Sequence, residues 1–206
     1  MAAGAVSTPK QPSSRLWRWL RRLGFVAAAL LLLSGAVFLA RFEGYRHLAG
    51  LPAFTHGAGE VTEVMVPMRD GVKLHTRVFL PAGPGSFPTV LMRNPYSLLT
   101  PLERTHCGLL VRFGYACVLQ DVRGQMDSEG EWVPVVHERE DGLDALAWLV
   151  AQPFVDGNIA LRGPSYLTCA QWAIADELPP EVKTLVPQVF GSDLRLAMFE
   201  RGQLRT

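Results

Sequence analysis

The chain has 206 residues, a formal net charge of +1 and 49% hydrophobic residues. This length and apolar content predict one packed domain with appendages. The near-neutral charge, without a basic run interleaved with aromatic residues beyond the N-terminus, argues against a nucleic-acid partner. No motif implies a metal or an organic cofactor.

An apolar segment near the N-terminus predicts a transmembrane helix. Residues 23–40 carry no charge and are just long enough to span a bilayer. Residues 1–22 form a basic tail, whose cations are Lys10, Arg15, Arg18, Arg21 and Arg22. This excess of positive charge places the N-terminus in the cytoplasm and the rest of the chain outside it. We therefore expect a membrane anchor, with the domain on the extracytoplasmic side.

A cleaved signal peptide is the alternative interpretation of the same segment. Ser34-Gly35-Ala36 offers a small-residue cleavage site, after which the protein would be secreted. The basic region is long and the apolar run exceeds a usual signal core, so we favour the uncleaved anchor.

An antiparallel hairpin should open the domain, which we place at residues 61–206 after a linker at 41–60. Val61–Met68 and Val72–Leu80 both alternate apolar and polar residues, as half-buried strands do. Asp70-Gly71 lies between them, and Asp-Gly is a strong signal for a tight turn.

Strands and helices then alternate along the chain. The expected strands are Thr89–Met92, Tyr115–Leu119, Asn158–Arg162 and Val182–Phe190, and the expected helices are Leu102–Phe113, 137–151 and Ser165–Ala175. This order predicts an α/β fold with a mostly parallel sheet and right-handed crossovers. Ligands of such sheets bind at the carboxyl ends of the strands.

One strand-to-helix junction has the layout of a nucleophile elbow. Ser165 follows Gly163 by two residues and lies between the strand Asn158–Arg162 and the helix that begins at Ser165. Such a turn exposes the serine hydroxyl beside the amides of the helix N-terminus, which can bind an oxyanion. The alternative is that Ser165 is an ordinary helix N-cap without a catalytic role.

The three cysteines, Cys107, Cys117 and Cys169, argue against a zinc site or a disulfide framework, because their number is odd and no Cys-x-x-Cys occurs. We expect Cys117 and Cys169 to be small core residues.

Several segments together resemble the cocaine-esterase and X-prolyl-dipeptidyl-peptidase group of α/β-hydrolases, over about residues 61–195. They are Met68–Val72 (MRDGV), Arg93–Tyr96 (RNPY), Gln120–Gly124 (QDVRG) with Ser128–Gly130 (SEG), Phe154–Asn158 (FVDGN) and Gly163–Leu167 (GPSYL). The resemblance implies an α/β-hydrolase-type sheet and hydrolysis of an ester or a short peptide through an acyl-serine intermediate.

Carried over residue by residue, the resemblance makes Ser165 the nucleophile. It makes the Tyr166 backbone N–H and the Tyr96 hydroxyl the two oxyanion donors, so these groups should converge. The family usually has glycine at the position of Thr168, so the bulk of threonine puts the elbow geometry in doubt.

A general base and a triad acid are missing from this pattern. The five histidines, His47, His56, His75, His106 and His137, all precede Ser165, whereas α/β-hydrolases place the acid and the histidine after it. Asp193 follows its strand one step too early for the acid. We therefore expect the N-terminal part of a longer hydrolase, truncated after the strand that follows the nucleophile helix. The alternative is a non-catalytic, degenerate hydrolase or interaction module.

The remaining polar candidates have structural interpretations. We expect Asp121 and Arg123 to pair with each other or with loop backbone. His75 alternates with apolar residues in the hairpin and should lie on the sheet surface. His106 should lie in the first crossover helix, and His137 should start the next helix, as a cap or in solvent.

Overall fold

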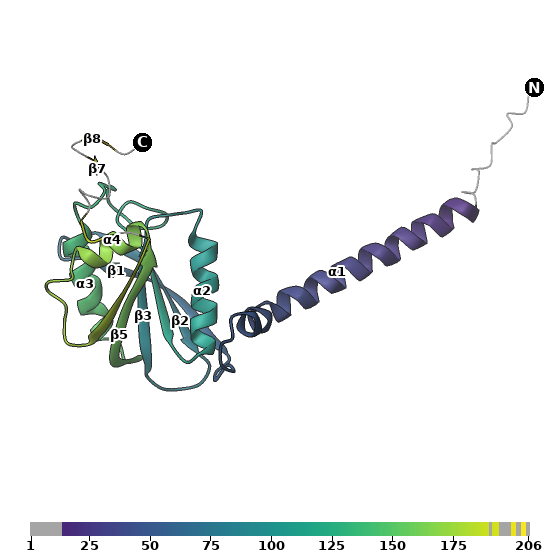
Figure 1. Ribbon diagram of the computed structural model, residues 1–206, viewed down its shortest axis with the longest axis horizontal. Helices are drawn as coiled ribbons and strands as arrows, with labels where there is room; N and C mark the ends of the chain where they lie inside the picture. The colour runs from purple at the N-terminus through teal and green to yellow at the C-terminus, as the bar shows by residue number, and fades with distance from the viewer. Residues whose placement is uncertain (1–13, 190, 194–198, 201–202, 205–206) are drawn as a thin grey trace, which may run out of the picture. The chain divides into compact units, whose positions relative to one another are not determined.

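The computed structural model describes residues 14–189, 191–193, 199–200 and 203–204. The chain divides into two compact units, the first ending at Pro52 and the second beginning at Ala53 (Figure 1). Among the described residues, the first unit contains one long helix, and the second contains a six-stranded sheet, a two-stranded sheet and three helices.

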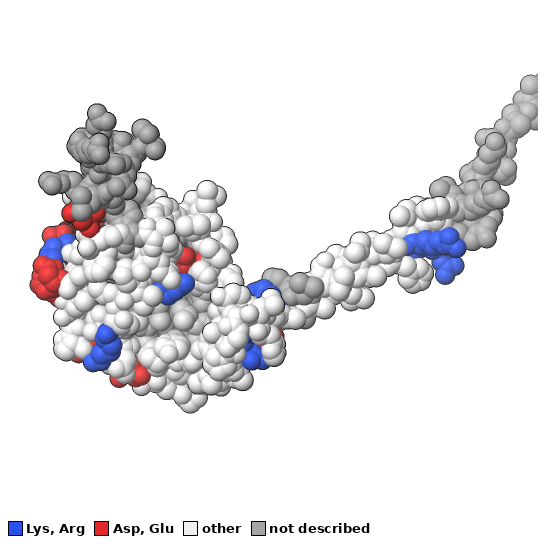
Figure 2. All heavy atoms as spheres, in the orientation of Figure 1, with Lys and Arg blue, Asp and Glu red and all other residues white. Residues whose placement is uncertain are grey.

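The helix α1 runs from Ser14 to Leu48 and contains the whole predicted apolar segment 23–40. Its stretch Trp19–Ala36 is long and apolar enough to cross a membrane, by length and composition, and none of that stretch is buried. Within this stretch Arg21 and Arg22 precede residues 23–36, which carry no charge. Figure 2 shows basic side chains on the helix beside a long part of it without charged residues. A signal sequence can have the same length and apolar composition.

The C-terminal end of α1 lies within the predicted linker 41–60. An ion pair between Glu43 and Arg46, one turn apart at 2.8 Å, supports these last turns. The helix ends at Leu48. Gly50, two residues later, has a left-handed φ of 64°, and the Leu51 amide donates to the carbonyl of Arg46. Residues 58–60, at the other end of the predicted linker, already belong to a strand.

The second unit is built on a six-stranded sheet of order β1-β2-β4-β3-β5-β6. Its outer hairpin is antiparallel, β2 and β4 also pair antiparallel, and β4, β3, β5 and β6 are parallel neighbours. This confirms the predicted α/β-hydrolase-type sheet. The strands are β1 (Ala58–Pro67), β2 (Lys73–Pro81), β3 (Phe87–Asn94), β4 (Ala116–Asp121), β5 (Val155–Pro164) and β6 (Val182–Gln188).

The hairpin turns where Asp-Gly predicts it. Gly71 adopts a φ of 88°, and its amide donates to the carbonyl of Met68 at 2.9 Å. The Met68 amide in turn donates to the carbonyl of Val72. A left-handed residue at this position favours glycine, so the turn fixes the register of β1 against β2.

Helices cover both faces of the sheet. Val90 and Met92 of β3 pack with the helix α2 (Thr100–Arg112), whereas Leu91 packs with α3 (Glu138–Val150) on the other face (Figure 1). This alternation follows from the two-residue period of a strand. The nucleophile-elbow helix α4 (Tyr166–Trp172) is three residues shorter at its end than predicted.

The expectation about the cysteines is wrong for one pair. Cys107 of α2 and Cys117 of β4 form a buried disulfide with a Cα–Cα distance of 5.3 Å, and only Cys169 of the three is free. The odd count concealed this pair because one leftover thiol does not prevent two others from meeting. Their contact is decided by α2 packing across β4, which no spacing rule contains.

The C-terminal residues add one correction. The strand predicted to reach Phe190 ends at Gln188, and Phe190 lies outside the described residues. Beyond it, β7 (Phe199–Glu200) and β8 (Gln203–Leu204) pair as a separate two-stranded sheet. The expectation that Val182–Phe190 is the last strand is therefore wrong.

The disulfide leads to a stability prediction. Replacing Cys107 and Cys117 by alanine should lower the free energy of unfolding by roughly 2–3 kcal/mol, because the bridge closes a short loop in the unfolded chain. Urea denaturation measures the change, with Cys169→Ala as the matched control. In addition, alkylation of the denatured, unreduced protein should modify one thiol by mass spectrometry. Modification of all three thiols would contradict the bridge.

Candidate active site

The backbone at Ser165 has the sharp strand-to-helix turn of a nucleophile elbow. Ser165 lies between β5 and α4 with φ 54° and ψ −123°, a conformation that non-glycine residues rarely adopt. Gly163 has a φ of 147°, and a Cβ at this position would collide with the Leu167 side chain. The glycine two residues before the serine is therefore required for α4 to fold back against the strand.

Thr168 fixes this turn rather than disturbing it. Its side chain is fully buried, and its hydroxyl oxygen lies 2.7 Å from the Gly163 carbonyl oxygen and 2.9 Å from that of Gln188. The Gln188 amide donates to the same hydroxyl at 2.9 Å, and the Ser165 amide donates to the Gln188 carbonyl. The threonine thus connects the elbow to the end of β6, and the elbow forms without a glycine here.

Tyr96 reaches the serine from the neighbouring strand. It follows the end of β3 in a turn held by Asn94, whose side chain accepts from the Tyr96 amide and donates to the Tyr96 carbonyl. The Tyr96 hydroxyl lies 3.1 Å from the Ser165 Oγ, and the Tyr166 amide donates to it at 3.3 Å. The three groups singled out from the sequence therefore meet at the carboxyl edge of the sheet, where the Tyr96 hydroxyl contacts both the Ser165 hydroxyl and the Tyr166 amide.

The side chain of Tyr166 was not singled out from the sequence. Its hydroxyl donates to the Glu138 carboxylate at 3.0 Å and accepts from the Val135 amide at 2.7 Å. Burial, together with the negative charge of Glu138, raises the pKa of Tyr166 to about 12, so the phenol stays neutral at physiological pH. The sequence gives no direct signal for the bond between Tyr166 and Glu138, since Glu138 stands out only as an acidic residue at the start of a helix.

Buried ion pairs hold the loops of this edge. Arg93 donates to Glu138 at 2.7 Å and to Gln120 at 3.0 Å, and all three residues are at most 4% exposed. Arg123 donates to Asp141 and to Asp70, and both bonds raise the pKa of its guanidinium. Arg123 therefore has a structural role, as expected, but it pairs with Asp141 and Asp70 rather than with Asp121.

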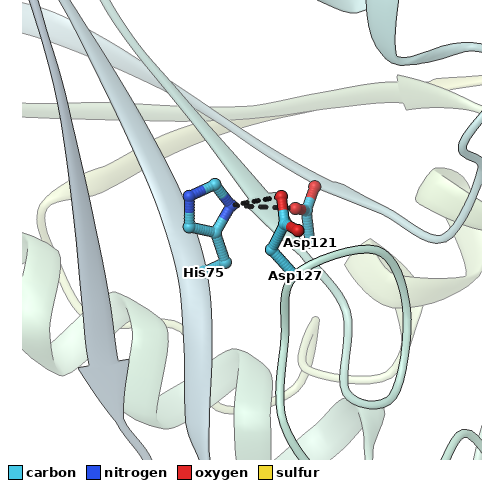
Figure 3. Close-up of side chains that lie close together, drawn as sticks. All are labelled: His75, Asp121 and Asp127. Carbon is cyan, nitrogen blue, oxygen red and sulfur yellow. Dashed lines mark hydrogen bonds and ion pairs between the residues drawn. The ribbon is translucent and has the colours of Figure 1, made fainter.

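Asp121 also pairs elsewhere than expected, in a buried cluster with His75. Arg77 donates to both Asp121 oxygens at 2.9 Å and to Asp127 at 3.1 Å. The His75 Nδ1 lies 3.0 Å from Asp121 and 3.8 Å from Asp127, and its ring points toward both carboxylates (Figure 3). His75 is only 7% exposed, so its expected position on the sheet surface is wrong. The loop after β4 folds over it, and the Ser128 hydroxyl accepts from its amide.

His75, Asp121 and Asp127 are close enough together to hold a metal ion. However, the guanidinium of Arg77 already lies against both carboxylates, where a divalent cation would need their oxygens. The donor set therefore fits an ion-pair network that joins β2, β4 and the following loop better than it fits a metal centre.

None of the five histidines hydrogen-bonds to Ser165 in the described part of the chain, where the bond of its hydroxyl goes to Tyr96. His106 lies in α2, as predicted, and its Nδ1 is 3.1 Å from Glu103. His137 precedes α3 in the N-cap position, but its side chain makes no capping bond.

A cavity of about 240 Å³ lies at the opposite edge of the sheet. Its walls include Thr89, Ile159 and Thr184, which come from the amino-terminal parts of β3, β5 and β6. Ser165 follows the carboxyl end of β5, so this cavity is not the catalytic site.

The fold and the elbow define the chain as an α/β-hydrolase. Residues 70–206 match the family model of the X-Pro dipeptidyl-peptidase (S15) family, and the chain belongs to this family. It is 40% identical over 137 residues to the cocaine esterase of Rhodococcus sp. (strain MB1 Bresler), a match that covers 65% of this chain and 24% of that protein.

Two solved structures extend the comparison. An α-amino acid ester hydrolase is 32% identical with a TM-score of 0.58, covering 68% of this chain and 27% of that one. An aminopeptidase from the marine sediment archaeon Thaumarchaeota archaeon is 29% identical with a TM-score of 0.55, covering 65% and 25%. The chain thus spans about a quarter of the length of these relatives.

Thr168 provides a test of how the elbow is held. Thr168→Val keeps the shape of the side chain but removes the hydroxyl, so the Gln188 amide loses its acceptor. The free energy of unfolding should fall by about 1–3 kcal/mol, measured by chemical denaturation. Thr168→Ser keeps the hydroxyl and is the control. Equal loss in both variants would show that packing of the methyl group, rather than the hydrogen bonds, matters.

Proposed function

We propose that the chain supplies the nucleophile and the oxyanion hole of a serine hydrolase that cleaves esters or amides through an acyl-serine intermediate. The observation that carries this proposal is the position of the Tyr96 hydroxyl, which lies 3.1 Å from the Ser165 Oγ and accepts from the Tyr166 amide at 3.3 Å. Family membership supports it, since relatives include an esterase and an ester hydrolase.

In the proposed reaction the Ser165 Oγ attacks the substrate carbonyl carbon, and the carbonyl π electrons move onto the oxygen. The Tyr96 hydroxyl and the Tyr166 amide then donate to this oxyanion, as preorganised neutral donors. The Ser165 proton passes to a general base and from there to the leaving alcohol or amine. Water cleaves the acyl-serine by the reverse sequence of proton transfers.

The general base and its acid come, in this proposal, from a segment outside these 206 residues. His75 is bonded to Asp121 and His106 to Glu103, on β2 and α2, so both are already engaged elsewhere. Substrates proposed from the family are acyl or aryl esters, amino-acid esters and X-prolyl peptides. A non-catalytic role is the second candidate, and the lack of a histidine bonded to Ser165 within the described residues favours it.

We further propose that α1 anchors the protein in a membrane with its N-terminus in the cytoplasm. The basic residues before the apolar stretch support this orientation. The Cys107–Cys117 bridge supports it independently, because disulfides persist in oxidising compartments outside the cytoplasm. Secretion after signal cleavage would give the domain the same environment.

Catalysis is tested in the protein extended through the acid and the histidine. Ser165→Ala should abolish ester hydrolysis and labelling by a fluorophosphonate probe. Tyr96→Phe should lower kcat by roughly 10²–10³, the usual effect of losing one oxyanion donor. Ser97→Ala and Tyr115→Phe are matched controls. Full activity of the Ser165→Ala variant would refute the nucleophile, and full labelling of the unextended chain would contradict the need for a further base.

The anchor is tested by deletion. Without residues 1–40 the protein should move from the membrane fraction to the soluble fraction, as measured by sedimentation and immunoblotting. N-terminal sequencing of the mature protein distinguishes the two alternatives. A mature terminus near Val37 would show signal cleavage and overturn the anchor.

A further inference from the structure

Four apolar side chains are exposed in one short segment beside the elbow. Trp132, Val133, Val135 and Val136 are 38%, 42%, 39% and 60% exposed. Together they form what we call the apolar wall, residues 132–136 without Pro134. A cluster of exposed apolar residues in one place indicates a binding function more often than isolated ones do.

The apolar wall is joined to the residue that follows the nucleophile. The Val135 amide donates to the Tyr166 hydroxyl at 2.7 Å, and the Trp132 ring meets the Tyr166 ring edge to face with centroids 6.0 Å apart. The Tyr166 amide donates to the Tyr96 hydroxyl, which in turn contacts the Ser165 hydroxyl. The wall therefore begins at the side chain of the residue whose backbone bounds the proposed oxyanion hole.

Two backbone positions constrain the loop that carries the apolar wall. Gly124 has a φ of 67°, and a Cβ there would collide with the backbone of Glu131 and Trp132. Val135 has a φ of 70°, which is strained for a β-branched residue. Such a conformation persists where surrounding contacts fix it, and here its amide is bound by Tyr166.

The Tyr166 hydroxyl is itself fixed to the sheet. It donates to Glu138, whose carboxylate is bound by Arg93 at the end of β3. Because the guanidinium neutralises this carboxylate and the phenol is neutral, the support of Tyr166 adds no uncompensated charge to the apolar wall. An aryl or branched alkyl group would lose water there without leaving a buried polar group unpaired.

We propose that the apolar wall binds an aryl or branched alkyl group of the ester, so that Trp132 and Val135 determine substrate specificity. This inference rests on the proposed serine hydrolase function and names its substrate class. We infer that the substrate reaches the apolar wall because the wall is continuous with the elbow. Tyr166 follows Ser165 in the elbow, and its side chain contacts the wall. The group comes either from the acyl side or from the alcohol side of the ester, and the experiment separates the two.

The experiment measures kcat/KM in the extended protein for two pairs of esters. The acyl pair is 4-nitrophenyl acetate and 4-nitrophenyl benzoate, and the alcohol pair is methyl acetate and benzyl acetate. Within one pair, Trp132→Ala should lower kcat/KM for the ester with the added phenyl group, relative to its partner, about tenfold or more, and that pair identifies the side. The partner ester of the same pair should keep its kcat/KM within about twofold. Tyr166→Phe, which releases the Val135 amide, should lower the same ratio.

Val150→Ala is the matched control, because Val150 is an exposed valine at the far end of α3 and should leave both ratios unchanged. An equal loss for all four esters on Trp132→Ala, or a lower melting temperature with unchanged ratios, would mean that the wall packs against protein and would overturn the proposal. If Ser165→Ala keeps full activity, or if no ester is hydrolysed, the proposed serine hydrolase function is refuted, and the proposal for the apolar wall is refuted together with it.

Discussion

The sharp turn between β5 and α4 is the constraint on which the rest of the site depends. It holds Ser165 at a positive φ, a conformation that costs roughly 1–3 kcal/mol for a residue with a side chain. Gly163 leaves room for Leu167, and the Thr168 hydroxyl ties the turn to the end of β6. Without these contacts the chain would relax into an ordinary helix start, and the serine hydroxyl would leave the donors around it.

Arginines organise the loops around this turn. Arg77, Arg93 and Arg123 are each at most 7% exposed, and each binds carboxylates from another part of the chain. A buried ion pair adds little net stability, because desolvation opposes its Coulombic attraction. Breaking one side, however, leaves an uncompensated charge. Such pairs therefore specify one loop arrangement, and here the arrangement brings α3, through Glu138, to the side chain of Tyr166.

The two units of the chain carry separate tasks in this proposal. The helix α1 has the length and composition of a membrane span, and the domain carries half of a catalytic constellation. The chain covers about a quarter of the length of its relatives. The proposed nucleophile and the proposed donor Tyr96 follow the ends of β5 and β3, and none of the histidines in the described part of the chain hydrogen-bonds to Ser165.

The sequence alone determined the features that depend on local pattern. Alternation and turn residues located the hairpin and the strands, and the Gly-x-Ser spacing between a strand and a helix located the elbow. Resemblance of several short segments together added Tyr96, which no local rule would select, since a tyrosine after Asn-Pro is an ordinary loop residue.

Only the tertiary structure decided which distant side chains meet. The Cys107–Cys117 bridge, the burial of His75 beside Asp121, and the bond of Tyr166 to Glu138 each join residues from different elements. Thr168 shows the same point, because the sequence counted its bulk against the elbow and the fold uses its hydroxyl to hold it. Periodicity fixes which face a residue occupies, but the partner on the other element depends on how strands, helices and loops pack together.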